Sequence, residues 1–218
     1  MTGIALSARS GLAAVVLVLG AVVGAATADA PALSLRATVI GVAPDAPLSI
    51  TLFSWPTETE RAPLLTALSA PARASAPAAA PAGGRGGRAG RGRQSLPPPG
   101  PLARLSAAVK AAPTFGFIWG DGVTGYSIKY AWHSSLADGI ERIVLVTDRR
   151  LGAHAADWAP LPGAAVDSDF TLIEMRIDAR GVGEGKASLG TNVGVDASSK
   201  TLALEGYATA PTLLKVTR

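Results

Sequence analysis

The sequence contains no cysteine. This absence excludes disulfide bonds, thiolate nucleophiles and zinc sites built from thiolates. It also excludes the anchoring of a bacterial lipoprotein, which needs a cysteine at its cleavage site. The fold must therefore be held together by the burial of apolar side chains alone, and 218 residues are enough for one ordinary core.

Complete motifs of two enzyme classes are also missing. No Gly-x-Ser-x-Gly elbow presents a serine nucleophile. The glycine-rich run 181–186 ends in Gly185-Lys186, but Arg180 stands where a phosphate-binding loop needs glycine, and Ala187 replaces its hydroxyl residue. The residues after Ala187 are typical of a strand, so we interpret the run as a glycine-rich β-turn.

Histidine is scarce, since His133 and His154 are the only two in the chain. Their separation of 21 residues fits neither a helical nor a hairpin metal site. We expect surface or strand-end histidines and no metal or cofactor. The alternative is a hydrolase or metal-dependent enzyme that uses either histidine with nearby carboxylates such as Asp148 and Asp157. Asp167 and Asp169 are expected to be solvated loop residues.

One long apolar run is present, at residues 12–24, behind a weakly positive start at Arg9. It is shorter than the roughly 20 residues of a spanning helix, and Ala26-Thr27-Ala28 has the small-x-small pattern of a cleavage site. We therefore predict a Sec-type signal peptide at 1–28 and a periplasmic or secreted protein. The alternative is an uncleaved N-terminal membrane anchor. After cleavage, no membrane association is expected.

The positive charge is concentrated in one segment. The formal net charge is +4, but six arginines and no acidic residue lie in residues 71–104. Segment 70–101 consists almost entirely of Ala, Pro, Gly, Arg and Ser, which predicts a disordered insertion. No Phe or Tyr stands between its arginines to stack on bases, so we expect no specific nucleic-acid partner. Weak polyanion contact through Arg85, Arg88, Arg91 and Arg93 is the alternative.

The rest of the chain has mainly β periodicity. Apolar residues alternate at 33–42 and again in runs near 48–53, 115–119, 126–132, 140–148, 170–178, 185–195, 201–205 and 213–216. Two short helices are expected, one near Pro63 after a turn at 57–62, and one after Pro101. This pattern predicts an antiparallel β-sandwich or open barrel with two short helices.

Two groups of residues are candidates for a ligand surface. Asp148, Arg149 and Arg150 end an apolar strand, where adjacent arginines can hold an anion. Tyr126, Tyr130 and Trp132 alternate along one strand and, with Phe115 and Trp119, are candidates to line a pocket. The alternatives are a solvated strand end and an ordinary apolar core.

Four segments carry a resemblance to known proteins: Trp55-x-Thr57-x-x-Glu60-Arg61, Arg142–Arg149, Phe170–Asp178 running into Gly183-x-Gly185-Lys186, and Leu213–Val216. The chain resembles a group of exported bacterial proteins, frequent in acidobacteria-like genomes, to which no activity has been assigned. The resemblance covers about 35–69 and 102–218, and it transfers no catalytic residue. Pro63 departs from the usual helical residue of the group.

The sequence thus predicts one exported domain, in two parts at 29–69 and 102–218, separated by the insertion 70–101. We expect a non-enzymatic binding or structural module of the cell envelope whose partner is unknown. No catalytic residue is assigned.

Overall fold

The computed structural model describes residues 30–40, 47–71, 99–120, 125–151, 169–188, 192–210 and 212–218. The expected signal peptide at 1–28, most of the insertion, and the four arginines at 85–93 lie outside these ranges, as do His154, Asp157 and Asp167. Among the described residues, no helix combines the length and apolar character needed to span a membrane.

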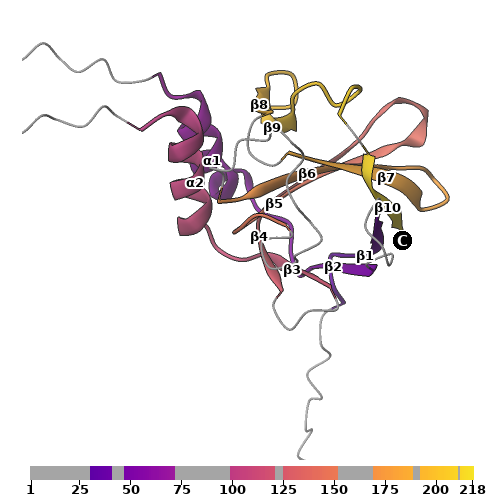
Figure 1. Ribbon diagram of the computed structural model, residues 1–218. Coiled ribbons are helices and arrows are strands. Elements are labelled where there is room, and N and C mark those ends of the chain that lie inside the picture. The colour runs from indigo at the N-terminus through magenta and orange to yellow at the C-terminus, as the bar shows by residue number, and fades with distance from the viewer. Residues whose placement is uncertain are drawn as a thin grey trace, which may run out of the picture.

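Eight antiparallel strands form a closed barrel (Figure 1). Its order is β1-β10-β7-β6-β5-β4-β3-β2, so β1 to β7 pair with their sequence neighbours and β10 closes the barrel against β1. The barrel strands are β1 (Leu33–Val39), β2 (Pro47–Leu52), β3 (Gly116–Trp119), β4 (Tyr126–Ser135), β5 (Glu141–Thr147), β6 (Thr171–Ile177), β7 (Val182–Ser188) and β10 (Thr212–Thr217). The antiparallel β class is confirmed, and the barrel is closed rather than open or a sandwich.

Alternation along the strands supplies the barrel interior. In β1, Leu33, Leu35, Ala37 and Val39 are buried, while Ser34 and Arg36 between them are exposed. Inward-facing apolar residues of the other barrel strands complete this first core. Because a strand side chain points to the opposite face every second residue, the same alternation leaves the outer face of the barrel polar wherever nothing covers it.

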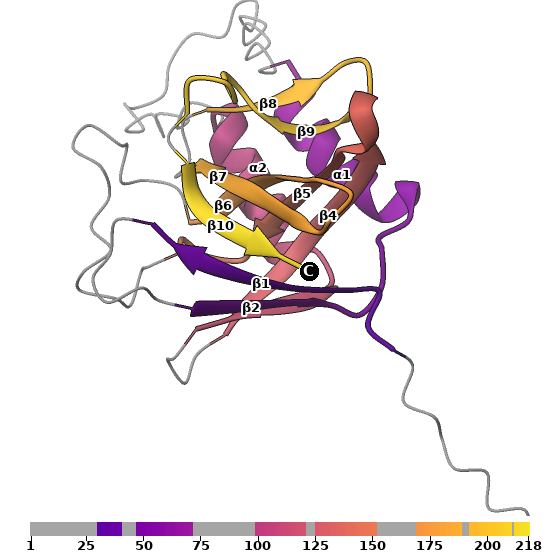
Figure 2. The same ribbon diagram turned by 90° about the vertical axis from the view of Figure 1, so that its right-hand side faces the viewer.

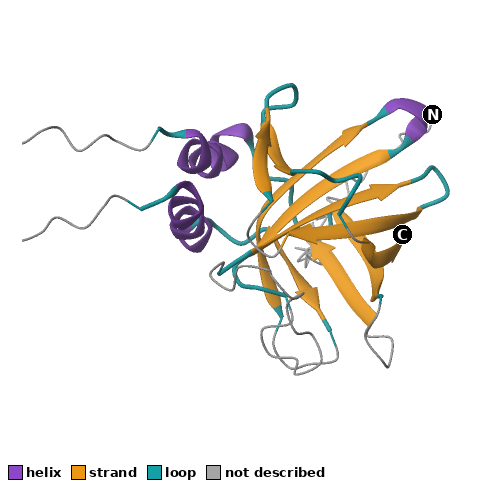
Figure 3. Cartoon of the chain, turned by 45° about the horizontal axis from the view of Figure 1, so that its top comes forward, coloured by secondary structure: helices purple, strands orange, loops and turns teal. Residues whose placement is uncertain are grey.

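A second core lies outside the barrel, against the outer faces of β4, β5 and β6. The helices α1 (Glu58–Ser69) and α2 (Pro101–Ala111) contribute Leu64, Leu105 and Val109 to it. The two-stranded sheet β8 (Val193–Asp196) and β9 (Thr201–Leu204) contributes Val193, Leu202 and Leu204. Figure 3 shows the helices beside one flank of the barrel. Strands β5 and β6 are therefore buried on both faces, which explains their continuous apolar runs.

Helix α1 begins earlier than the sequence predicted. Thr57 and Glu60 form a capping box, and the helix runs from Glu58 through Pro63. The expectation that 57–62 forms a turn before the helix is wrong. Pro63 cannot donate to the carbonyl of Thr59, but Thr59 is exposed, so water can hydrate that carbonyl and the cost of the proline is reduced.

Arg104 connects the two helices. Its Nε donates to the carbonyl of Ala67 at 3.0 Å and one terminal nitrogen donates to Ala70 at 2.5 Å, both at the end of α1. The other terminal nitrogen donates to Pro99, just before α2, at 2.8 Å. One guanidinium thus satisfies carbonyls on both sides of residues 72–98. Two of these carbonyls belong to the end of α1, where the last carbonyls of a helix have no partner within the helix.

The strand segments predicted from the sequence match most strands of the structure, with two corrections. Residues 185–195 do not form one strand, because β7 ends at Ser188 and β8 begins at Val193. Most of the glycine-rich run at 181–186 is not a turn, because Val182–Lys186 belong to β7 and only Gly181 closes the turn Asp178–Gly181 before it. Gly183 lets the backbone of Arg176 approach closely, and Gly185 leaves space for the side chains of Met175 and Leu214.

Candidate functional site

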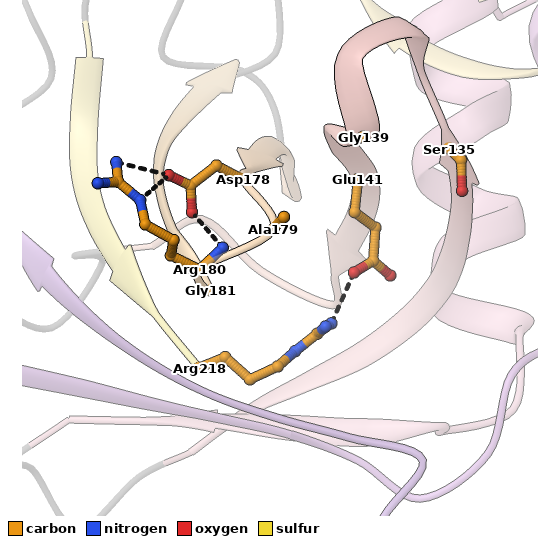
Figure 4. Close-up of a pocket in the computed structure, with 8 residues that line it drawn as sticks. All are labelled: Ser135, Gly139, Glu141, Asp178, Ala179, Arg180, Gly181 and Arg218. Atoms are coloured by element: carbon orange, nitrogen blue, oxygen red, sulfur yellow. Dashed lines mark hydrogen bonds and ion pairs between the residues drawn. The ribbon is translucent and has the colours of Figure 1, made fainter.

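A pocket of about 410 Å³ lies at one end of the barrel, which we call the mouth. Three segments far apart in the sequence line it: the β4–β5 connection, the β6–β7 turn and the residue after β10 (Figure 4). The lining residues are Ser135, Gly139, Glu141, Asp178, Ala179, Arg180, Gly181 and Arg218. The site depends on one long-range pairing, since Arg218 reaches the β6–β7 turn only because β10 pairs with β7.

The β4–β5 connection is a tight turn. Asp138 and Gly139 have φ of 63° and 71°, in the left-handed region that Asp and Gly tolerate best. The backbone nitrogen of Leu136 donates to the carbonyl of Ile140 at 2.7 Å. This turn places Ser135 and Glu141 opposite each other, as cross-strand partners at the mouth.

The β6–β7 turn is organised by the carboxylate of Asp178. Its Oδ1 accepts hydrogen bonds from the backbone nitrogens of Arg180 at 2.9 Å and Val182 at 3.0 Å. The backbone of Val182 and the side chain of Arg180 hold the pKa of the Asp178 carboxyl below its usual range. Asp178 is therefore engaged by its own turn, while the Arg180 guanidinium remains exposed beside the pocket.

Glu141 is the centre of the charged groups at the mouth. Its Oε2 accepts a hydrogen bond from Arg218 at 2.7 Å, and Figure 4 shows this bond as the dashed line between the two side chains. Its Oε1 lies 3.5 Å from Nδ1 of His133. The imidazole of His133 stacks on Trp55, with ring centroids 4.1 Å apart. The side chains of Glu141, His133 and Arg218 are 25%, 49% and 49% exposed, so water and solutes can reach all three.

This arrangement presents charges of both signs around one polar opening. Arg218 and Arg180 supply N–H donors, Glu141 supplies acceptor oxygens, and Ser135 can do both. His133 lies between Glu141 and Trp55, and imidazole and carboxylate groups are both common general acids and bases in enzymes. Within the described ranges, no group of three or more His, Asp or Glu side chains converges as a metal site.

The predicted residues Asp148, Arg149, Arg150 and Tyr126 lie at the opposite end of the barrel from the mouth. Asp148 accepts a hydrogen bond from the backbone nitrogen of Ser127 at 3.0 Å, and Arg149 lies over the ring of Tyr126 and donates to the carbonyl of Gly125. Arg150 is partly buried. The Arg149 side chain is thus engaged by its own neighbours, and Asp148 helps to join β4 to β5.

The alternation predicted that the aromatic row of β4 lies on one face, and this prediction is wrong. The register shifts between Ile128 and Tyr130, so Ile128 points into the barrel while Tyr130 points outward to the second core. Tyr130 is fully buried, hydrogen-bonds to Thr201, and accepts from the backbone nitrogen of Leu202 at 3.2 Å. Trp132 packs against the same core. Phe115 faces the barrel interior, whereas Trp119 is 43% exposed.

A second charged cluster is buried beneath the β8–β9 sheet. Arg142 on β5 donates to both carboxylate oxygens of Glu174 on β6, at 2.9 and 3.0 Å, and to Asp196 on β8 at 3.0 Å. Glu174 also accepts from the backbone nitrogen of Leu204 on β9 at 3.2 Å. Despite burial, the hydrogen bonds and charge of Glu174 raise the pKa of Arg142. These groups satisfy one another and fasten β8 and β9 to the barrel.

Sequence reasoning missed Glu141, Arg218, Ser135 and Arg180 as site residues. The one local signal it did not use is Asp138-Gly139, a strong hairpin-turn pair that indicates where β4 and β5 meet. Asp169, expected to be only solvated, forms an ion pair of 2.5 Å with Lys110 on α2, and this lowers the pKa of its carboxyl.

Comparisons with protein-family models, with curated proteins and with solved structures yield no match to this chain. The site is therefore interpreted from its own geometry.

Proposed function

We propose that the protein is a non-enzymatic binding module of the cell envelope, and that the mouth holds a small zwitterionic solute. The observation that carries this proposal is the Glu141–Arg218 ion pair, which spans a pocket of about 410 Å³ while both side chains stay open to solvent. Apolar side chains occupy the barrel interior beneath, so the pocket offers a polar surface over a packed core.

A solute with one carboxylate and one ammonium group matches this pair. Its carboxylate can take the place of Glu141 on the Arg218 guanidinium, in the fork geometry that arginine favours. Its ammonium can take the place of Arg218 on Glu141. The exchange replaces one internal ion pair by two intermolecular ones and leaves no charge without a partner. Arg180 and Ser135 offer further polar contacts at the rim.

Titration calorimetry with a panel of free amino acids tests the proposal. We expect binding by the zwitterions, and weaker binding by the matching amino acid amides and N-acetyl derivatives, which each lack one charge. Glu141→Gln and Arg218→Gln should each abolish measurable binding, while Lys110→Gln, a change in an exposed ion pair remote from the mouth, should not. Equal binding by the charge-deleted derivatives, or by either mouth variant, would refute it.

A second candidate is a hydrolase or metal-dependent enzyme, which the 3.5 Å approach of His133 to Glu141 favours. Metal analysis and a screen with activated esters, on wild type and on His133→Ala combined with His154→Ala, separate the two. Bound metal or esterase activity that the double variant loses would establish the second candidate over the first.

Export is part of the same proposal. Expression of the full chain in a Gram-negative host, followed by fractionation and mass spectrometry, should give a periplasmic product that begins at Asp29. Intact, untrimmed protein in the cytoplasmic fraction would contradict export, and an intact chain in the membrane fraction would support the anchor instead.

A further inference from the structure

The outer face of β1, β2 and β3 carries an exposed aromatic group. Phe53, directly after β2, is 56% exposed, and Trp119 at the end of β3 is 43% exposed. Phe117 lies between them, with its ring centroid 5.8 Å from that of Phe53 and 5.5 Å from that of Trp119. We call these three residues the aromatic trio. Contiguous exposed aromatic side chains on a soluble domain mark interaction surfaces more often than isolated ones do.

The trio lies on the side of the barrel that no helix or second sheet of the described residues covers. In Figures 1 and 2, β1 and β2 lie away from the two helices and from the β8–β9 sheet, which cover the outer faces of β4, β5 and β6. The trio is thus separate from both apolar cores, and neither core includes any of its members.

The ring of Trp119 lies against the backbone of Gly125. A Cβ added to Gly125 would stand 2.9 Å from two ring atoms, which is closer than such contacts occur. Glycine at 125 therefore lets the indole approach the beginning of β4 closely, while Trp119 remains 43% exposed. A ring supported in this way loses less side-chain freedom when a ligand stacks on it.

Hydroxyl side chains surround the trio. The register places Ser34, Thr51, Phe117 and Ser127 in one row across four strands. The next row holds Arg36, Ser49 and Trp119. Neighbouring strands are about 4.8 Å apart, so Arg36 and Trp119 lie about two strand spacings apart, with a hydroxyl between them.

The charge of this face has a single sign. The sequences of β1, β2 and β3 include Arg36 and no acidic residue. Lys215 on β10 marks one edge of the face, where it sits opposite Glu184 on β7. The described strands of this face therefore carry no carboxylate that would repel an anion, and Arg36 is placed to receive a carboxylate.

Aromatic rings, hydroxyls and one guanidinium together fit an acidic sugar chain. The C–H-rich face of a sugar ring packs on the electron-rich face of an aromatic ring. Sugar hydroxyls both donate and accept hydrogen bonds, as Ser and Thr do. A membrane surface would make no use of the hydroxyl rows, and a nucleic acid would need several cations for its phosphates rather than one.

We propose that the outer face of β1, β2 and β3 binds an acidic polysaccharide, with sugar rings on Trp119 and Phe53 and a uronate carboxylate on Arg36. This surface is distinct from the mouth and does not depend on what the mouth binds.

Titration calorimetry with hexagalacturonate at 150 mM salt tests this inference on the full chain. Trp119→Ala should weaken binding about tenfold or more, a loss typical of one stacked ring. Arg36→Gln should weaken hexagalacturonate binding about five- to tenfold, and should leave binding of the carboxyl-reduced hexasaccharide unchanged. Val182→Ser changes an equally exposed apolar residue on β7 and serves as the matched control, with no loss expected.

Gly125→Ala provides a second variant that keeps the indole but displaces it, and it should weaken binding less than Trp119→Ala. Thermal unfolding of each variant shows whether the fold is retained. Undiminished binding by Trp119→Ala and Gly125→Ala would overturn the inference. So would loss of binding only when Arg85, Arg88, Arg91 and Arg93 are all changed to Gln, or binding to anionic vesicles without binding to the hexasaccharide.

Discussion

Two charged clusters in this protein start from adjacent residues of one strand and have opposite characters. Glu141 and Arg142 begin β5, and the pleat sends them to opposite faces. Glu141 joins Arg218 and His133 at the open mouth, with its side chain 25% exposed. Arg142 joins Glu174 and Asp196 beneath the β8–β9 sheet, where Arg142 and Glu174 are only 7% and 1% exposed. The difference shows that burial, and not residue type, decides whether an ion pair serves structure or remains open to a ligand.

The clusters also differ in how completely their atoms are used. Both oxygens of Glu174 accept bonds from Arg142, and one accepts a further bond from Leu204. A buried charge needs this degree of satisfaction, because no water can compensate for a missing partner. At the mouth, water can hydrate a group that loses its partner, so breaking the Glu141–Arg218 ion pair costs little.

The largest effect is expected from Glu174→Gln. The neutral amide would leave the Arg142 charge buried with Asp196 as its one remaining anion, and we expect a loss of about 3–5 kcal/mol in the free energy of unfolding. Urea denaturation at pH 7 measures it. The double variant Arg142→Met, Glu174→Leu should be closer to wild type, because it removes both charges. A loss below about 1 kcal/mol for Glu174→Gln would show that the cluster is not sealed by β8 and β9.

A smaller, pH-dependent effect is expected from Asp196→Asn. Hydrogen bonds from Ser198 and Ser199, together with the bond from Arg142, hold the pKa of Asp196 well below its ordinary value of 3.8. A lowered folded-state pKa stabilises the protein above the unfolded value and loses that contribution as the pH falls toward the folded value.

We therefore expect Asp196→Asn to cost about 1 kcal/mol at pH 7. Below about pH 4, the difference in unfolding free energy between the variant and wild type should narrow, because unfolded wild type then takes up a proton on Asp196 that the folded state does not, which favours unfolding. Urea denaturation at pH 7, 4, 3 and 2.5 measures the gap. A gap that stays constant over this range would contradict the role assigned to the charge.

The smallest effect on stability is expected from Glu141→Gln, below about 0.5 kcal/mol, because exposed ion pairs contribute little. The same change should abolish binding at the mouth. Glu141→Gln should therefore affect binding with little effect on the free energy of unfolding, whereas Glu174→Gln should lower the free energy of unfolding itself. Urea denaturation and calorimetry on one preparation give both values. A stability loss as large as that of Glu174→Gln would remove the contrast between the clusters.

The strands were predictable because each has a local signal. Leu33 to Val39 alternates with period two, and β5 and β6 are apolar on both faces because helices and the β8–β9 sheet cover them. The bulge near Lys129 has no such signal. It reverses which face Tyr130 and Trp132 occupy, and only the pairing of β4 with β5 reveals it.

The mouth was not predictable for a related reason. Arg218 reaches the segments of Glu141 and Asp178 because β10 pairs with β7 across the intervening β8–β9 sheet, and a pairing over such a sequence separation leaves no local pattern. His133 was considered from its residue type alone, whereas its partner Glu141 became visible only in the structure. The predicted pair Arg149 and Arg150 follows the end of β5, and adjacency in the sequence does not by itself direct two side chains to one ligand.

The three hydrogen bonds that Arg104 donates have a consequence for the chain that can join α1 to α2. Because one side chain already secures the last turn of α1 to the approach of α2, whatever joins them adds only a slowly growing, logarithmic closure cost. Insertions of widely different length and composition between Ala70 and Pro99 should therefore leave the barrel fold unchanged.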